Sequence, residues 1–369
     1  MKFTLIQVFR GIAAMLVVMH HLIANSKNHL NYIPYSNFFN FGFVGVDFFF
    51  VLSGFIITHV HFDDLKSQGI NSWNFFKKRF IRIYPIYWII AVVFLLIYLI
   101  STPQFMIDAG LTMDLTSPPV IKLLIESFLL LPNPDIRLVG VAWTLSYEML
   151  FYIVFGICIS YGFRFSKVAG AVWVVLILLY TFANTPGGIY MDFFFNILIL
   201  EFLMGCLVAY FICNQVAFSW KFAFPILLIL FVLLQQTMHI NGLVFFRDIV
   251  TVTLMGLFFS LITYLAVRFD QANPSYKFPA FLVLIGDASY SIYLSHNMLL
   301  SGLTRTFALL NPGGEGKAFL PLVATLIFLI TVLSGVFLHL FVEKKLLRFF
   351  NQKFFAKKVR VESRIAVRD

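Results

Sequence analysis

The chain has 369 residues, of which 60% are hydrophobic and only 12% charged, and its mean hydropathy is +0.90. This composition excludes a water-soluble fold, because too little polar surface is left to cover it. The formal charge of +10 is divided among short loops and a tail instead of forming one basic face, so we expect no nucleic-acid partner.

Apolar stretches long enough to cross a lipid bilayer recur along almost the whole chain and predict an all-α, polytopic membrane helical bundle. We expect about ten transmembrane helices, near residues 8–25, 43–61, 83–101, 141–160, 168–184, 191–213, 222–237, 249–267, 280–301 and 319–342. Residues 1–345 then form a membrane domain, and residues 346–369 form a basic cytoplasmic tail. The first stretch contains Arg10, His20 and His21 and is followed by no small-residue cleavage site, so we interpret it as a retained span and not as a signal peptide.

The distribution of Lys and Arg predicts how these spans are oriented. If both termini are cytoplasmic, the inside segments hold 21 of the 27 Lys and Arg residues and the outside segments hold six. Cytoplasmic loops of membrane proteins carry such an excess. The pattern therefore predicts a multi-pass protein of the cell (inner) membrane with both termini in the cytoplasm and an even number of spans.

The longest outside connection runs over residues 102–140. It contains five prolines and the acidic residues Asp108, Asp114 and Asp135. Long loops of this kind often carry function. We expect this one to cap the outer side or to face an acceptor.

The three cysteines, Cys158, Cys206 and Cys213, fall inside or at the edge of apolar segments. A cysteine there is usually a small buried hydrophobe, so we assign no disulfide, metal or catalytic role to them. No internal repeat or pair of interrupted helices is present, which argues against a secondary transporter.

Two polar side chains of the first span share one face of the helix. Arg10 and His21 are eleven residues apart, close to three full turns, with a rise of roughly 16 Å between them. One helix therefore offers a cation near the inner surface and an imidazole in the outer half. His20 points about 100° away from His21, and we interpret it as a structural histidine.

Asp47 opens the second span at a depth similar to that of His21. Two interpretations fit it. Its carboxylate could hold one nitrogen of His21, which would fix the tautomer and raise the basicity of the other nitrogen. It could instead cap its helix, because Asp is a favoured N-cap residue.

Further titratable side chains occur in the third, fourth and ninth spans, where charge is costly and usually functional. Arg79 and Arg82 share one helix face as a fork suited to phosphate, although the spacing alone fits ordinary anchoring at the inner surface better. Glu148 lies one or two turns into the fourth span from the outside, and His296 lies in the outer half of the ninth. Either of these two could also simply join helices.

Sorted by depth, the residues form two groups. His21, Asp47, Glu148 and His296 are expected toward the outer half, whereas Arg10, Arg79 and Arg82 are expected at the inner surface. An anionic cytosolic donor at one end and proton-transfer chemistry at the other would require this arrangement.

At these residues the sequence resembles acyltransferase family 3, the membrane O-acyltransferases that acylate exopolysaccharides, lipopolysaccharide O-antigens and related glycans. The resemblance covers essentially the whole membrane chain. Its motifs are Arg10-Gly11 followed by His21, Gly45-Val46-Asp47-Phe48-Phe49-Phe50-Val51-Leu52-Ser53-Gly54, Arg79-Phe80-Ile81-Arg82-Ile83-Tyr84-Pro85, Trp143-Thr144-Leu145-Ser146-Tyr147-Glu148 with Phe151-Tyr152, and Gly286-Asp287-Ala288-Ser289-Tyr290-Ser291 to His296.

The resemblance implies a cytosolic acyl-CoA donor, usually acetyl-CoA, handled by Arg10, Arg79 and Arg82, with His21 as the catalytic residue. Two motifs depart from the family pattern. Gln7-Val8 stands where many members have Asp-Gly, a variant associated with the exopolysaccharide-production branch. Glu343-Lys344-Lys345 replaces a Glu followed by Arg-Pro or Lys-Pro, which we interpret as a change in helix exit without chemical consequence.

The sequence therefore predicts a membrane O-acyltransferase that moves an acyl group from acyl-CoA to a hydroxyl of a cell-surface polysaccharide or its lipid-linked precursor. The candidate catalytic residues are His21, Asp47, Glu148 and His296, and the candidate donor-binding residues are Arg10, Arg79 and Arg82. We expect no metal and no permanently bound cofactor, and as partners the glycan acceptor, the bilayer and polysaccharide assembly proteins.

Two mechanisms remain open. The histidine of the first span acts either as a general base on the sugar hydroxyl, oriented by Asp47 or Glu148, or as a nucleophile that forms a transient acyl-histidine. The rival function is a transporter or flippase for a glycan or lipid that uses the same intramembrane charges as a substrate path.

Overall fold

The computed structural model describes residues 3–67, 72–108, 110–133, 136–184, 187–240, 248–311 and 317–365. The side chains of Asp135 and of the last four residues of the expected tail lie outside these ranges. Within them the chain is helical and contains no strand. The all-α prediction is confirmed.

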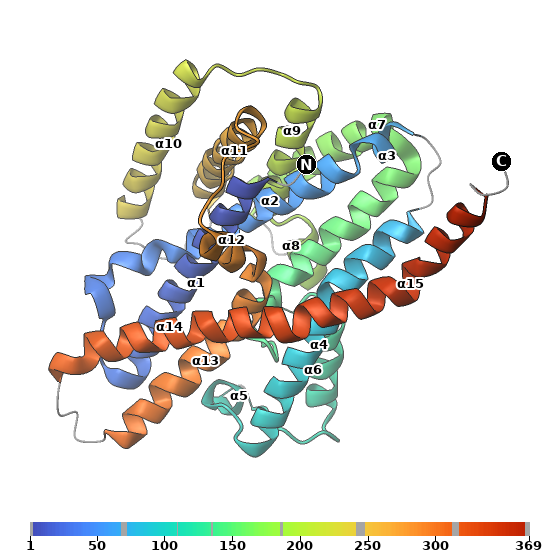
Figure 1. Cartoon of the computed structure of the whole chain (residues 1–369). Helices are drawn as coiled ribbons and strands as arrows, with labels where there is room; N and C mark the ends of the chain where they lie inside the picture. The colour runs from blue at the N-terminus through green and yellow to red at the C-terminus, as the bar shows by residue number, and fades with distance from the viewer. Residues whose placement is uncertain are drawn as a thin grey trace.

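The helices follow one another in chain order with short connections (Figure 1). They are α1 (Thr4–Leu30), the 3₁₀ segment η1 (Pro34–Phe43), α2 (Val44–Val60), α3 (Phe62–Lys66), α4 (Trp73–Ile100), α5 (Gln104–Asp108), α6 (Pro118–Phe128), η2 (Gly140–Ala142), α7 (Trp143–Ala183), α8 (Ile189–Phe194), α9 (Ile199–Cys213), α10 (Trp220–Ile240), α11 (Ile249–Ala272), α12 (Ala280–Asp287), α13 (Ser289–Leu310), η3 (Lys317–Phe319), α14 (Leu320–Leu338), the π-helical turn η4 (His339–Glu343) and α15 (Lys344–Ile365).

Several helix ends follow from local chemistry. The carboxylate of Asp248 accepts a hydrogen bond from the backbone N–H of Thr251 at 2.6 Å and so caps the start of α11. Helices α1 and α7 end where Asn31 and Asn184 adopt the left-handed conformation, each with φ 47°. Asn tolerates that conformation better than most residues.

Seven helical stretches of the described residues are long and apolar enough to cross a membrane. They are Thr4–Leu30, Pro34–Val60, Trp73–Ile100, Gly140–Ala183, Ile189–Cys213, Ile249–Ala272 and Leu320–Phe354. The other three expected spans correspond to the second half of α7, to α10 and to the α12–α13 segment. The protein is a multi-pass membrane protein, and the count of ten stays a prediction.

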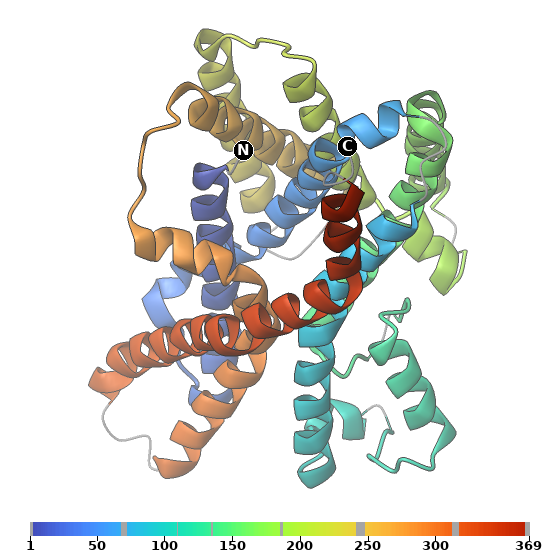
Figure 2. The same cartoon turned by 45° about the vertical axis from the view of Figure 1, so that its right-hand side comes forward.

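Three expected spans have a different internal shape. The span expected over 280–301 is not one helix, because it breaks at Ala288 between α12 and α13, which leave each other at an angle in Figure 2. The spans expected over 141–160 and 168–184 are joined in α7, which changes direction at Gly162, where φ is 83°. A residue without a Cβ adopts that angle readily.

The beginning of α1 and the end of α15 lie toward the same end of the molecule in Figures 1 and 2. This arrangement is what an even number of crossings produces. The assignment of that end to the cytoplasm stays a prediction. The domain boundary expected at 345/346 falls inside α15, whose Leu346 packs against the core.

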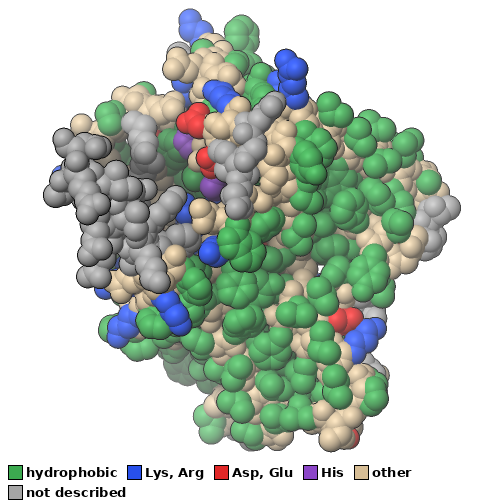
Figure 3. Space-filling model, turned by 90° about the vertical axis from the view of Figure 1, so that its right-hand side faces the viewer, with side chains coloured by type: hydrophobic (Ala, Val, Ile, Leu, Met, Phe, Trp, Pro, Cys, Tyr) green, Lys and Arg blue, Asp and Glu red, His purple; other side chains and the backbone are tan. Residues whose placement is uncertain are grey.

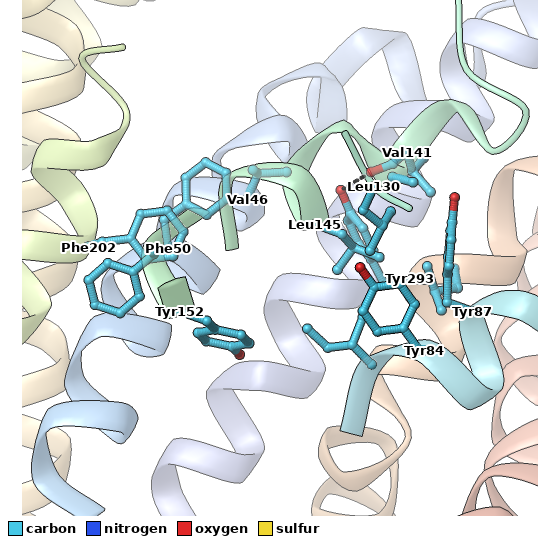
Figure 4. Packing of buried hydrophobic residues seen from close by; sticks show 14 of the residues in the cluster. Val46, Phe50, Tyr84, Tyr87, Leu130, Val141, Leu145, Tyr152, Phe202 and Tyr293 are labelled. Atoms are coloured by element: carbon cyan, nitrogen blue, oxygen red, sulfur yellow. Dashed lines mark hydrogen bonds between the residues drawn. The ribbon is translucent and has the colours of Figure 1, made fainter. Parts of the chain in front are cut away.

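Helices α2 and α9 cross at the centre of the bundle in close contact. A Cβ atom added at Gly54 of α2 would lie 1.9 Å from the carbonyl oxygen of Phe202, and one added at Gly205 of α9 would lie 1.9 Å from that of Val51. Small residues permit such an approach of membrane helices. Beside the crossing, the ring of Phe50 stacks on that of Phe202 with centroids 4.6 Å apart (Figure 4).

The outer surface is strongly apolar, as a bilayer requires. Large hydrophobic side chains are exposed on several helices, among them Leu96, Leu179 and Leu333. Figure 3 shows that hydrophobic side chains cover most of the described part of the face that carries α15 and α4. Polar side chains are therefore concentrated inside the bundle and at its ends.

Candidate functional site

The interior holds a cavity of about 550 Å³ that is bounded by α1, α2, α4, α7, α12, α13 and the junction of α14 with α15. Four cationic side chains line it: Arg10, Arg79, Arg82 and Lys344. Much of the remaining wall is apolar or aromatic, for example Phe49. The structure thus brings together the three arginines that the sequence singled out.

Arg10 is held on α1 by two hydrogen bonds. Its Nη1 donates to Oε1 of Gln7 at 2.9 Å, and its Nη2 donates to Oγ of Ser289 at 3.0 Å, at the start of α13. Gln7 belongs to the dipeptide that departs from the family pattern. Here its amide positions the guanidinium at the cavity wall.

Arg79 and Arg82 face the cavity from α4, which begins at Trp73, ten residues before the expected span. The guanidinium of Arg79 lies over the ring of Tyr152 at 5.6 Å, and its Nε has no hydrogen-bond partner among the described residues. The guanidinium of Arg82 lies over the ring of Tyr290 at 5.5 Å. Arg79 therefore keeps donor capacity for an anionic ligand.

Glu148, one of the two carboxylates that could orient His21, lines the same cavity. It accepts hydrogen bonds from the Tyr152 hydroxyl and, at 3.5 Å, from the Ser53 hydroxyl. The depth of a residue in one helix does not determine which neighbouring helix its side chain meets. The charges of Arg79 and Arg82 lie near this carboxylate and compensate it.

Glu343, which the terminal motif led us to interpret only as part of a helix exit, is a buried hydrogen-bond acceptor next to the site. It is 1% exposed, and it accepts hydrogen bonds from Nη1 of Arg82 at 2.8 Å, from Nδ1 of His339 at 2.7 Å and from Oγ of Ser291 at 2.7 Å. The π-helical turn His339–Glu343 shapes this place, and such turns often mark functional sites. A carboxylate buried at the end of the last apolar segment was the available signal.

The two candidate histidines form a cluster of their own, which is distinct from the cluster of arginines that lines the cavity. Nε2 of His296 lies 3.4 Å from Nδ1 of His21, and the ring centroids are 4.9 Å apart. His296 is fully buried, whereas His21 is half-buried. His20 bonds to the carbonyl oxygen of Asn40 at 2.7 Å through its Nδ1, which fits a structural role.

Asp47 lies in the first turn of α2 and is 3% exposed. The helix begins one turn earlier than its motif suggests, because η1 runs directly into it, and its N-cap residue is Phe43. The N-cap interpretation of Asp47 is therefore wrong. The hydrogen bonds described for His21 run to the carbonyl oxygen of Val17 and to His296.

Tyr293 connects the two clusters. Its ring lines the cavity and lies 5.7 Å from the ring of His296, centroid to centroid. Its hydroxyl is fixed by Thr144 at 3.0 Å and by the carbonyl oxygen of Val141 at 3.2 Å, the bond drawn in Figure 4. His21, Asp47 and His296 are not among the residues that line the cavity, and the ring of Tyr293 contacts both the cavity and the ring of His296.

No group of three or more His, Cys, Asp or Glu side chains that could hold a metal ion occurs in the part of the chain that the structure describes. The three cysteines are free thiols. The site thus consists of a cationic cavity and a buried imidazole pair. Such an arrangement can bind an anion at one end and move a proton at the other.

Comparisons with known proteins give a consistent result. A family model described as an acyltransferase domain matches residues 4–340. The exopolysaccharide production protein ExoZ of Rhizobium meliloti (strain 1021) is 26% identical over 325 residues, which cover 84% of this chain and 91% of that protein. Protein 2 in the picA locus of Rhizobium radiobacter is 28% identical over 165 residues, 42% of this chain and 81% of that protein.

The O-acetyltransferase OatA of Staphylococcus aureus (strain NCTC 8325 / PS 47) is 24% identical over 292 residues. These residues cover 69% of this chain but 45% of the staphylococcal protein. No solved structure matches the chain.

Proposed function

The chain belongs to the acyltransferase domain family, and from this premise we propose that it transfers an acyl group from cytosolic acyl-CoA to a hydroxyl of a cell-surface polysaccharide or its lipid-linked precursor. The names of two relatives, an exopolysaccharide production protein and an O-acetyltransferase, support a sugar acceptor and an acetyl group. The observation that carries the proposal is that Arg10, Arg79 and Arg82 line one and the same cavity.

The cavity suits the phosphate-bearing part of acyl-CoA. Guanidinium groups bind phosphate oxygens through paired N–H donors. Arg79 has an unused Nε, and Arg82 is oriented by Glu343 at 2.8 Å. The apolar part of the wall would accept the uncharged arm that leads to the thioester.

The imidazole pair suits proton transfer on the acceptor side. In this mechanism His21 takes the proton of the sugar hydroxyl, the oxygen bonds to the acyl carbon, and the carbon–sulfur bond breaks. The proton then passes to the departing CoA thiolate. The variant in which the imidazole carries the acyl group transiently uses the same residue.

The test is an assay of the purified protein in lipid with acetyl-CoA and a glycan acceptor, read as release of free CoA thiol and as a gain of acyl mass on the glycan. We expect both signals from the unaltered protein and neither from His21→Ala. His29→Ala, a histidine of the same helix outside both clusters, is the matched control and should retain activity. Thiol release from His21→Ala equal to that of the control would contradict the assignment.

The same assay separates the proposal from transport. A transporter or flippase would move the glycan or lipid across the vesicle membrane without consuming acetyl-CoA. No thiol release by the unaltered protein, together with glycan movement, would favour the transporter.

A further inference from the structure

A chain of hydrogen bonds orders the imidazole pair, and it starts at a peptide carbonyl. The carbonyl oxygen of Tyr293 lies 2.6 Å from Nδ1 of His296. A carbonyl oxygen only accepts hydrogen bonds, so Nδ1 of His296 carries a hydrogen. In a neutral imidazole the other nitrogen, Nε2, is then a bare acceptor.

This acceptor faces the second histidine. Nε2 of His296 lies 3.4 Å from Nδ1 of His21, and the same Nδ1 lies 3.0 Å from the carbonyl oxygen of Val17. The carbonyl oxygen of Val17 requires this nitrogen to carry a hydrogen, and Nε2 of His296 is placed to accept from the same N–H. The nitrogen of His21 that remains for proton uptake is Nε2.

We propose that His296 is a positioning residue that holds His21 in the tautomer whose Nε2 accepts the proton of the acceptor hydroxyl. His296 thereby has the task that we expected of Asp47 or Glu148. The inference rests on the proposed function and deepens it. It assigns the two histidines different roles, since only His21 exchanges a proton with the substrate.

The same hydrogen bonds also stabilise the protonated form of His21 that arises during the reaction. When Nε2 of His21 has taken the proton, its Nδ1–H becomes a charge-assisted donor to Val17 and His296. His296 is 0% exposed and its Nε2 lies 3.4 Å from Nδ1 of His21, so its contribution to the reaction runs through His21. Its removal should therefore change the chemical step and leave donor binding intact.

The test compares His296→Gln with His296→Leu in the purified protein in lipid. The side-chain oxygen of Gln reaches about as far as Nε2 of His and can accept from Nδ1 of His21, whereas Leu cannot. We expect Leu to lower kcat by about 10²-fold, the usual scale of general-base catalysis, with the KM for acetyl-CoA within twofold. The kcat of His296→Gln should be at least tenfold higher than that of His296→Leu.

Equal kcat values for the Gln and Leu variants, or a kcat of the Leu variant within twofold of the unaltered protein, would overturn the inference. If the Leu variant does not purify as a folded protein, His296→Met, which is unbranched and also cannot replace the acceptor, takes its place. Retained CoA binding shows that a variant is folded.

The outcomes distinguish this inference from the proposed function. No thiol release by the unaltered protein would refute the function itself. Loss of activity in His21→Ala together with full activity in the His296 variants would refute only the positioning role.

Discussion

The contact between α12 and α1 makes Gly286→Ala a sensitive test of the site. A Cβ atom at Gly286 would lie 1.9 Å from the carbonyl oxygen of Gln7, whereas real Cβ atoms essentially never lie closer than 3.0 Å to such an atom. The two helices must therefore separate by about 1.1 Å, because both sides of the contact are backbone. The hydrogen bond of 3.0 Å from Arg10 to Ser289 spans the same junction and would be stretched or lost.

A displacement of about 1 Å in a positioned site can cost about 10²-fold in rate, and overpacking costs about 1–3 kcal/mol of stability. We expect Gly286→Ala to lower kcat/KM for acetyl-CoA by 10-fold to 100-fold and to lower the Tm. The measurement is steady-state thiol release by the purified protein, combined with thermal unfolding in detergent.

Gly302→Ala on α13 is the matched control, because nothing lies within 4 Å of its added Cβ. It should leave kcat/KM within twofold and could raise stability by a few tenths of a kcal/mol through helix propensity. Wild-type kinetics and Tm in Gly286→Ala would refute the reasoning that this glycine sets the distance between α12 and Arg10.

Three other predictions concern two side chains of the cavity wall, Arg79 and Tyr293, and the carboxylate of Glu343 that bonds to Arg82. Glu343→Ala should raise the KM for acetyl-CoA and lower the free energy of unfolding by about 2–4 kcal/mol, because Arg82 loses its partner and buried polar groups lose their acceptor; unchanged values would contradict this. Arg79→Lys should weaken CoA binding about tenfold in calorimetry, since an ammonium group cannot replace the planar fork, and Lys78→Arg is the control that should bind normally. Tyr293→Ala should extend the range of acyl-CoA chain lengths that are used, whereas Tyr293→Phe should keep the original range; identical chain-length profiles would refute the role of the ring as a wall.

The membrane architecture could be predicted from the sequence because its signal is local. Apolar stretches of sufficient length predict spans wherever they occur, and the structure has helices at each of them. Helix geometry also predicts that Arg10 and His21 share a face, and in the structure both contact α13. Features that depend on one helix alone could therefore be predicted from the sequence.

Contacts between side chains of different helices could not be predicted from the sequence. Glu148 of α7 meets Ser53 of α2, and Glu343, in the π-helical turn that follows α14, meets Arg82 of α4. The break at Ala288 lies beside Gly286, which packs closely against α1. Such features follow from packing between segments that are distant in the sequence. The spacing of residues along the chain does not determine that packing.

The double attachment of Tyr293 has a consequence for the order of events. Its hydroxyl is anchored on the α7 side, and its peptide oxygen holds His296. A molecule that enters the cavity and contacts this ring therefore acts on α13, the helix that also carries the imidazole of His296. Arrival of the thioester and readiness of the proton acceptor are then linked, and linkage is reciprocal.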